Sequence, residues 1–321
     1  MRQFDVFNGD ADGICALHQL RLAEPMPSEL VTGVKRDIAL LARVALTAGD
    51  RVTVLDVSLD SNRADLLRLL AAGTQVRWFD HHFAGKIPAH AGLEAHIDTA
   101  ADVCTSLLVD RHLKGRYRQW AIVAAFGDGL KAVAQRLAAE AGLPAAETDA
   151  LARLGECLNY NAYGEKVDDL WFEPGALFRQ LHAFAEPGDF IRGSHVFAKL
   201  ESGYREDLAQ AAALLPMRAL PTGAVYVLPA AAWARRVSGV FANQLAQAHP
   251  QRAHALLSPN SDGGGYTVSV RAPVARAEGA DTLCRGFATG GGRKAAAGIN
   301  ALPEADIDRF VAAFYSAYHD D

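Results

Sequence analysis

The chain has 321 residues, of which 50% are hydrophobic, and its formal net charge is -5. A chain of this length usually has more than one hydrophobic core, so we expect two domains. The net negative charge, without a long basic run, excludes the broad positive surface by which proteins hold long duplex nucleic acid, so a nucleic-acid ligand would be short.

The first 82 residues alternate short β-rich runs with helical segments. The runs expected to form strands are residues 4–8, 29–34, 51–57 and 74–82. The helices expected between them start at Ile14, cover about 38–47 and cover 61–73. Alternation at this spacing is typical of βαβ units, so we expect an α/β domain with a parallel sheet and helices on both faces. Further helices are expected over 103–113, 119–141 and 146–159.

The pattern restarts after a segment rich in Gly and Pro, residues 185–222, which also holds a helical stretch near 205–215. Beyond it we expect a smaller α/β domain with strands, two helices, a glycine loop and a terminal helix. The expected strands are 224–229, 253–260 and 266–273, and the helices are 234–249, about 276–288 and 304–318. The predicted domains are 1–190 and 219–321, joined by a linker over 191–218.

Carboxylates stand at the ends of several predicted strands. Asp10 and Asp12 follow the first strand two residues apart, a spacing that points both side chains the same way in an extended chain, while Asp56 ends the third strand and Asp80 the fourth. Ligands of open α/β sheets bind outside the carboxyl ends of the strands, so these acids should converge there. Acids this close raise each other's pKa values, and divalent cations relieve the repulsion.

Two histidines, His81 and His82, follow Asp80 directly. Carboxylates combined with imidazole suit Mn, Fe or Zn better than Ca, and the cysteine spacing excludes a four-thiolate zinc site, so manganese is the first choice. Each acid taken alone is equally well explained as a helix cap. The whole set beside a His pair favours a metal site.

The sequence also resembles a known family in four segments. They are NGDADG (8–13), LDVSLD (55–60), DHH (80–82) and FGDG (126–129). In order and spacing they resemble the four motifs of the DHH phosphoesterase superfamily, which includes RecJ-type exonucleases, nano-RNases, cyclic-dinucleotide phosphodiesterases and family II pyrophosphatases. The resemblance implies two Mn²⁺ ions, with Mg²⁺ or Co²⁺ as alternatives. It implies that Asp10 binds the first ion, that Asp12, His81 and Asp128 bind the second, and that Asp56 bridges them.

The resemblance also assigns catalytic roles around the ions. Asp56 is the bridging ligand, Asp80 supports the metal cage, and His82 faces the substrate phosphate. The chain departs from the family at Val6, where many members carry a metal-binding His. The first ion is therefore expected to lack a nitrogen ligand.

A glycine run in the second domain suggests a phosphate site. The stretch FATGGGRKAAAGI (287–299) places Gly290, Gly291 and Gly292 before Arg293 and a helix-forming AAAG. Glycines let backbone N–H groups approach an anion, and a helix start adds partial positive charge, although such a run alone is more typical of a hinge. With Arg271 after an upstream strand, the stretch resembles the DHH-associated C-terminal domain, with Arg293 in place of the usual His. That resemblance implies that these residues bind the substrate phosphate, with Arg293 as a clamp rather than a proton donor.

The resemblance covers nearly the whole chain and is of the type found in nano-RNases and dinucleotide phosphodiesterases. It implies hydrolysis of short oligonucleotides, foremost linear dinucleotides such as pGpG, to mononucleotides by a metal-activated water in the cleft between the domains. Cyclic dinucleotides, 3′-phosphoadenosine phosphate and an inactive nucleic-acid-binding protein stay open as alternatives. No membrane or long-duplex DNA partner is expected, and a homodimer stays open. The four separated cysteines and the lack of an export or membrane-spanning segment predict a cytoplasmic protein.

Overall fold

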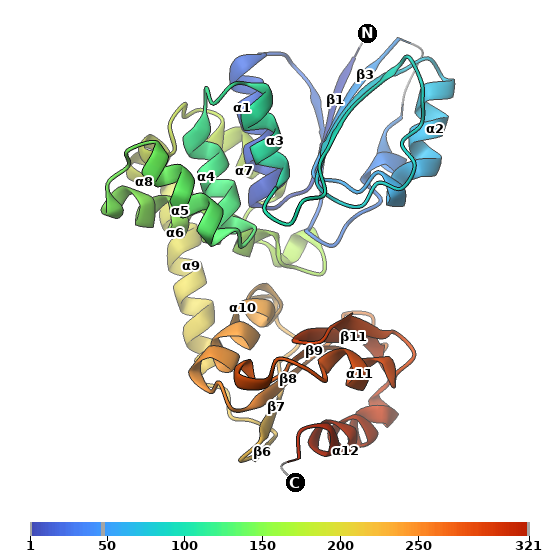
Figure 1. Ribbon diagram of the computed structural model, residues 1–321, viewed down its shortest axis with the longest axis vertical. Helices are drawn as coiled ribbons and strands as arrows, with labels where there is room; N and C mark the ends of the chain where they lie inside the picture. Colours follow the sequence, from blue (N-terminus) through green and yellow to red (C-terminus); the bar gives the residue numbers. More distant parts are fainter. Residues whose placement is uncertain (1, 46–48, 320–321) are drawn as a thin grey trace. The chain divides into compact units, whose positions relative to one another are not determined.

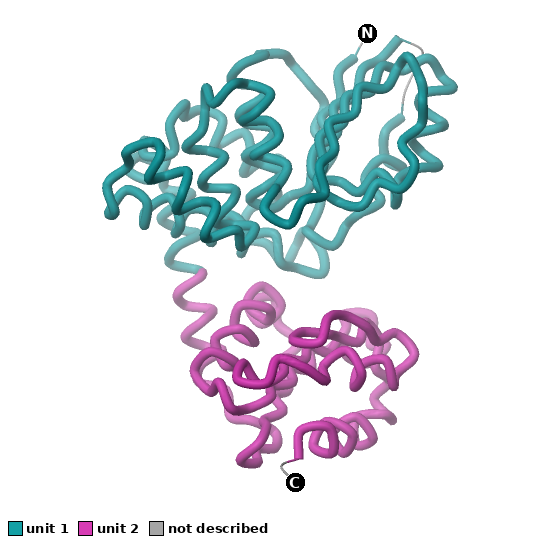
Figure 2. Tube along the Cα trace, viewed as in Figure 1, with its two compact units in different colours: residues 1–203 teal, residues 204–321 magenta. Residues whose placement is uncertain are grey.

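The structure, a computed structural model, describes residues 2–45 and 49–319. The chain forms two compact units, Met1–Gly203 and Tyr204–Asp321, which Figure 2 shows in different colours. Each unit has its own sheet. Among the described residues, no helix is both long and apolar enough to cross a membrane.

A five-stranded sheet forms the centre of unit 1. Its order is β2-β1-β3-β4-β5, and every neighbouring pair is parallel, which confirms the predicted parallel sheet. The strands are β1 (Gln3–Phe7), β2 (Glu29–Val31), β3 (Arg51–Leu55), β4 (Gln75–Asp80) and β5 (Leu93–Ile97). Strand β5 was not predicted from the sequence, because this edge strand is only partly buried and lacks a continuous apolar run.

Helices cover both faces of this sheet, as predicted, with α2 on one side and α1 and α3 on the other (Figure 1). Under α2, the side chains of Val54 and Trp78 pack with Leu66 in a buried apolar core. The helices of unit 1 and the one that runs into unit 2 are α1 (Ala11–Ala23), α2 (Arg63–Ala71), α3 (Thr105–His112), α4 (Arg118–Gly127), α5 (Lys131–Glu140), α6 (Ala145–Ala162), α7 (Pro174–Leu181), α8 (Pro187–Gly193) and α9 (His195–Ala212).

The prediction of a helix over 38–47 is wrong for the described residues of that segment. The chain forms only the 3₁₀ turn η1 (Leu40–Arg43) there, and residues 46–48 lie outside the described residues. Leu40, Leu41 and Val44 are all buried in the core beside β1 and β3. Because one short turn already buries these three side chains, tertiary packing overrides the helical propensity of the segment.

The single helix expected over 119–141 is two helices, α4 and α5. Helix α4 ends at Gly127, and Gly129 follows with a φ of 82°. A left-handed residue just beyond a helix is the usual C-terminal stop, and glycine adopts it without steric cost. The break places Asp128 at the end of α4 rather than inside a helix.

Unit 2 contains a six-stranded mixed sheet of order β10-β11-β9-β8-β7-β6. Helices α11 and α12 cover one face, where Leu283 and Phe310 pack against Val270, and Phe241 of α10 packs against Tyr226 of β7 on the other. The elements are β6 (Arg218–Leu220), β7 (Gly223–Val227), α10 (Ala232–Ala248), β8 (Ala253–Pro259), β9 (Tyr266–Arg271), α11 (Ala280–Arg285), β10 (Gly290–Arg293), β11 (Ala296–Leu302) and α12 (Ile307–Ala317).

The prediction that a helix starts after the glycine run is wrong. Gly290–Arg293 and Ala296–Leu302 are the antiparallel strands β10 and β11 of a hairpin. Ala297 and Ile299 alternate into the core, and β11 also pairs with β9. Strand pairing on both sides and burial at every second residue therefore outweigh the helix propensity of alanine.

A buried ion pair joins β1 to α1, the helix that Asp10 caps and whose first turn holds Asp12. The Arg21 guanidinium donates to both Asp5 oxygens, at 2.7 and 2.5 Å, and the Ser28 hydroxyl donates to Asp5 Oδ2 at 2.6 Å. The side chains of Arg21 and Asp5 are 3% and 0% exposed. A bidentate pair of this kind fixes the direction in which α1 leaves the sheet.

We expect Arg21→Ala to lower the free energy of unfolding by about 3 kcal/mol, because it leaves the Asp5 carboxylate buried without its cation. Arg68→Ala is the matched control, since Arg68 forms an exposed pair with Asp65, worth less than about 1 kcal/mol. Urea unfolding followed by circular dichroism measures both variants. Equal losses in the two would contradict this role of the buried pair.

Candidate metal centre

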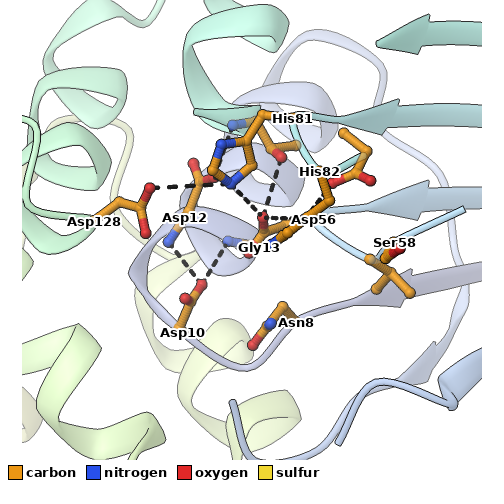
Figure 3. Close-up of polar contacts among 12 residues, drawn as sticks. Asn8, Asp10, Asp12, Gly13, Asp56, Ser58, His81, His82 and Asp128 are labelled. Carbon is orange, nitrogen blue, oxygen red and sulfur yellow. Dashed lines mark hydrogen bonds and ion pairs between the residues drawn. The ribbon is translucent and has the colours of Figure 1, made fainter. Parts of the chain in front are cut away.

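The acids predicted to converge do so at the carboxyl ends of the parallel strands of unit 1. Asp10 caps α1 and Asp12 lies in its first turn, Asp56 directly follows β3, and Asp80 ends β4. A hollow of about 180 Å³ opens there, lined by Asn8, Asp10, Lys35, Asp37, Ile38, Asp56, Val57, Ser58, His81, His82 and Asp128. Figure 3 shows several of these side chains facing one another around the start of α1.

The His81 imidazole lies at the centre of a group of carboxylates (Figure 3). Its Nε2 is 3.4 Å from Asp56 Oδ1, 4.0 Å from Asp12 Oδ2 and 4.0 Å from Asp128 Oδ2. The ligand atoms of Asp12, His81 and Asp128 all lie within 4.8 Å of one another. One nitrogen and several carboxylate oxygens at this spacing can hold a divalent ion such as Mn²⁺.

The N-terminus of α3 orients Asp12. The backbone N–H groups of Thr105 and Ser106 donate to its two carboxylate oxygens, each at 2.7 Å, and the Thr105 hydroxyl donates to Asp56 Oδ1 at 3.2 Å. Hydrogen bonds to metal ligands fix their direction. This support was not predicted from the sequence, although a Thr-Ser pair at the start of a predicted helix is a typical N-terminal signal.

The backbone at Asp56 is strained. Asp56 has a φ of 58°, a left-handed conformation that residues other than glycine rarely adopt. Its backbone N–H donates to the Phe79 carbonyl of the neighbouring strand at 3.0 Å, which holds the conformation in place. Strain of this kind persists where the surrounding structure fixes the residue, frequently at functional sites. Here it aims the carboxylate at His81.

Asp80 positions His82. The Asp80 carboxylate is fully buried, and its Oδ1 lies 2.7 Å from His82 Nδ1. This contact raises the pKa of His82 above its ordinary value, against the opposite effect of burial. With Nδ1 donating to Asp80, the other ring nitrogen is left for a ligand. Asp80 Oδ2 is buried without a hydrogen-bond partner among the described residues, as expected of an oxygen beside a cation.

Asp10 has a different environment from the other acids. Its Oδ1 caps α1 by accepting from the N–H groups of Asp12 and Gly13, at 3.0 and 3.1 Å. Its Oδ2 accepts from the Lys35 ammonium at 2.5 Å. Burial alone would raise the pKa of Asp10, but the charge and hydrogen bond of Lys35 lower it below its ordinary value. Lys35 was not among the predicted site residues, because it belongs to no recognisable sequence motif.

Two of the acids bind protons readily when no metal is present. Burial, followed by the charges of Asp10, Asp12 and Asp80, raises the pKa of Asp56 well above its ordinary value. Burial and the charges of Asp12 and Asp10 raise the pKa of Asp128 to about 6. Buried like charges of this kind are stabilised by a divalent ion, so the residues present fit a metal.

The arginines predicted to bind phosphate lie in the sheet of unit 2 with one strand between them. Arg271 of β9 and Arg293 of β10 both pair with Ala296 of the strand between them. Directly paired residues point to the same face, so the two arginines flank Ala296 about 10 Å apart at their Cα atoms. Arg271 also donates to Asn243 Oδ1 of α10 at 2.7 Å.

The three glycines of β10 have different surroundings. A Cβ on Gly290 would lie 1.7 Å from the Cys284 carbonyl oxygen, and Gly292 has a φ of 138°, so packing and backbone conformation explain both. A Cβ on Gly291 would meet no described atom within 4 Å. Of the three, Gly291 is therefore the one whose glycine neither packing nor backbone conformation explains.

Comparison of the sequence with protein-family models gives no match, and comparison with curated proteins gives none either. Among solved structures the chain is similar to exonuclease RecJ bound to manganese, with 20% identity, a TM-score of 0.63 and coverage of 100% of this chain and 91% of that one. It is similar to PggH from Vibrio cholerae, a pGpG-specific phosphodiesterase, with 14% identity, a TM-score of 0.58 and full coverage of both chains. The protein has the DHH fold. RecJ from Thermus thermophilus with Mn²⁺ gives 20% identity and a TM-score of 0.57, with all of this chain covering 52% of that one.

Within the DHH fold, the residues predicted from the four motifs separate into two groups. The residues of the predicted second ion lie together, because the carboxylates of Asp12, Asp56 and Asp128 surround His81. Asp56 was the residue predicted to bridge the two ions. The first ion was expected at Asp10, which accepts from the Lys35 ammonium and belongs to neither group of described residues that can hold an ion. Val6, where a His is usual in the family, is fully buried in the apolar core under α2 and offers no ligand.

We expect Mn²⁺ to raise the melting temperature more at about pH 7.5 than at about pH 5, because metal ligands must be deprotonated. Without metal, the pKa of Asp128 is about 6 in the fold against an ordinary 3.8. Protonation there stabilises the metal-free fold at low pH, and this contribution is lost as pH rises through 3.8 to about 6. Thermal unfolding with and without Mn²⁺ at both pH values tests this. Equal Mn²⁺ shifts would contradict it, and Asp56→Asn is the control with a weakened site.

Proposed function

We propose that the protein is a metal-dependent phosphodiesterase that hydrolyses linear dinucleotides such as pGpG to mononucleotides. The observation that carries this proposal is the group of carboxylates around His81 Nε2 at the strand ends of a DHH fold. The similar solved structures are named as a manganese-bound exonuclease and a pGpG-specific phosphodiesterase. Both names point to phosphodiester bonds, and the manganese in the first supports Mn²⁺ as the ion here.

The metal, when bound, lowers the pKa of a water so that hydroxide is available near neutral pH. Asp12, Asp56, His81 and Asp128 would hold the ion. His82, whose Nδ1 faces Asp80, presents Nε2 to a non-bridging oxygen of the substrate phosphate. A hydrogen bond that strengthens as charge builds on this oxygen lowers the barrier to attack.

The size of the hollow favours a small reacting group. About 180 Å³ is below the roughly 300–1,000 Å³ of pockets that enclose a whole organic ligand. It suits one phosphate beside an ion, with the bases outside. Phe83 follows His82 directly and is 73% exposed, so its ring is available for a base to stack on.

We expect hydrolysis of pGpG with Mn²⁺ to be lost on chelation and to fall by about a thousandfold in Asp56→Ala, since removing a metal ligand costs several kcal/mol of transition-state stabilisation. The measurement is turnover of a panel: pGpG, pApA, longer oligonucleotides, cyclic dinucleotides, 3′-phosphoadenosine phosphate and pyrophosphate. Activity that survives chelation would remove the metal mechanism. A preference for long strands, for cyclic dinucleotides or for 3′-phosphoadenosine phosphate would replace the dinucleotide, and binding without turnover would indicate an inactive nucleic-acid-binding protein.

We further propose that Arg271, Gly291 and Arg293 bind the terminal phosphate of the substrate, since two guanidinium groups on one sheet face suit a phosphate. We expect Arg293→Ala to raise KM for pGpG about tenfold or more with little change in kcat, as for uniform binding. Dinucleotides without the terminal phosphate should be cleaved equally by this variant and the wild type. Arg285→Ala, at an exposed arginine of α11, is the control. An unchanged KM in Arg293→Ala would exclude the residue from the site.

A further inference from the structure

Lys35 places a positive charge inside the acidic site. Its Nζ lies 2.5 Å from Asp10 Oδ2 and 3.7 Å from Asp128 Oδ1, and it donates to Asn159 Oδ1 at 3.2 Å. The Tyr163 ring lies below it, with its centroid 5.6 Å away. Two carboxylates, an amide oxygen and an aromatic face form a complete environment for an ammonium group.

The backbone around Lys35 is held on both sides. Its N–H donates to the Ala162 carbonyl at the end of α6 at 3.0 Å, and its own carbonyl accepts from the Asn8 side chain at 3.4 Å. The side chain is 26% exposed and lines the hollow beside Asp56 and His82. Lys35 is therefore anchored in the site rather than extended into solvent.

In this arrangement Asp10 already has a cation of the chain beside it, unlike Asp12, whose oxygens accept only from neutral backbone N–H groups. One oxygen caps α1 and the other accepts from Lys35. Neither of the two groups of described residues that can hold an ion includes Asp10. A second ion bound to Asp10 would lie next to the Lys35 ammonium, which is 2.5 Å from Asp10 Oδ2, and two positive charges this close repel each other unless the lysine moves away.

We propose that the Lys35 ammonium takes the place of one of the two divalent ions, so that the centre binds a single ion at His81 and Lys35 supplies the second positive charge beside Asp10. The inference rests on the proposed function, which requires an ion at His81. Lys35 acts as a positioning residue: it holds Asp10 in the geometry that caps α1 and thereby places Asp12. Because its charge is fixed to the chain, this part of the site is formed before any metal arrives.

The first test is the Mn²⁺ stoichiometry of the full chain, measured by calorimetry and by electron paramagnetic resonance. We expect one ion per chain and the uncoupled signal of an isolated Mn²⁺ ion. Two ions with a coupled signal would overturn this inference and leave the proposed function intact. No bound ion, together with no hydrolysis of pGpG, would overturn the proposed function as well.

The second test separates the charge of Lys35 from its packing, in the metal-free protein. We expect Lys35→Gln to lower the melting temperature by about 5 °C, since it removes the cation from a buried pair. Lys35→Arg keeps the charge and should keep one Mn²⁺ per chain and most of the melting temperature. Asp10→Asn combined with Lys35→Gln should recover more than half of the loss, because the unpaired charge is gone.

Lys131→Gln is the matched control, because Lys131 is 70% exposed and only 4.0 Å from its acidic partner Glu156. Its melting temperature and Mn²⁺ stoichiometry should equal those of the wild type. If Lys35→Gln behaves like this control, the inference is overturned. It is overturned equally if Lys35→Arg loses as much stability as Lys35→Gln, since the loss would then come from packing and not from charge.

Discussion

The repulsion between buried carboxylates at the strand ends of unit 1 is the constraint on which the rest of this site depends. Asp10, Asp12, Asp56 and Asp80 are each at most 3% exposed, and such a group folds only when positive charge or hydrogen-bond donors surround it. The chain supplies donors to Asp12 and Asp10 from two helix N-termini and supplies Lys35 from a loop. The negative charge that the chain does not neutralise lies on the carboxylates around His81. A divalent ion therefore fits best at that position.

The parallel sheet explains why this constraint exists at all. Successive parallel strands end at the same edge, so acids placed after β1, β3 and β4 must meet. The Asp5–Arg21 pair ties β1 to α1, while α3 reaches the site from 93 residues beyond Asp12. The local sequence therefore places the acids at the strand ends, and long-range packing sets the direction of each side chain.

Much of the fold and part of the site could be predicted from the sequence, because the strand ends and the four motifs are local patterns. The convergence of Asp10, Asp12, Asp56 and Asp80, with His81 next to Asp80, was predicted from their places at the strand ends. Asp128 follows a helix, and only the resemblance to the four motifs placed it in the site. Lys35 could not be found this way, since its importance comes from a contact with Asp10 that depends on how the loop after β2 folds. The hairpin at Gly290 was missed for a similar reason: its alanines favour a helix in isolation, and only pairing with β9 makes them a strand.

The left-handed backbone of Asp56 limits how this position can vary. Glycine adopts that conformation without strain, so Asp56→Gly would relax the backbone and also remove a buried like charge, and the protein would gain stability as it loses a ligand. A substitution that raises stability at this residue would therefore lower activity. An aspartate at this position in related chains would then indicate selection for catalytic activity. A glycine there would indicate a protein that keeps the fold and has lost the activity.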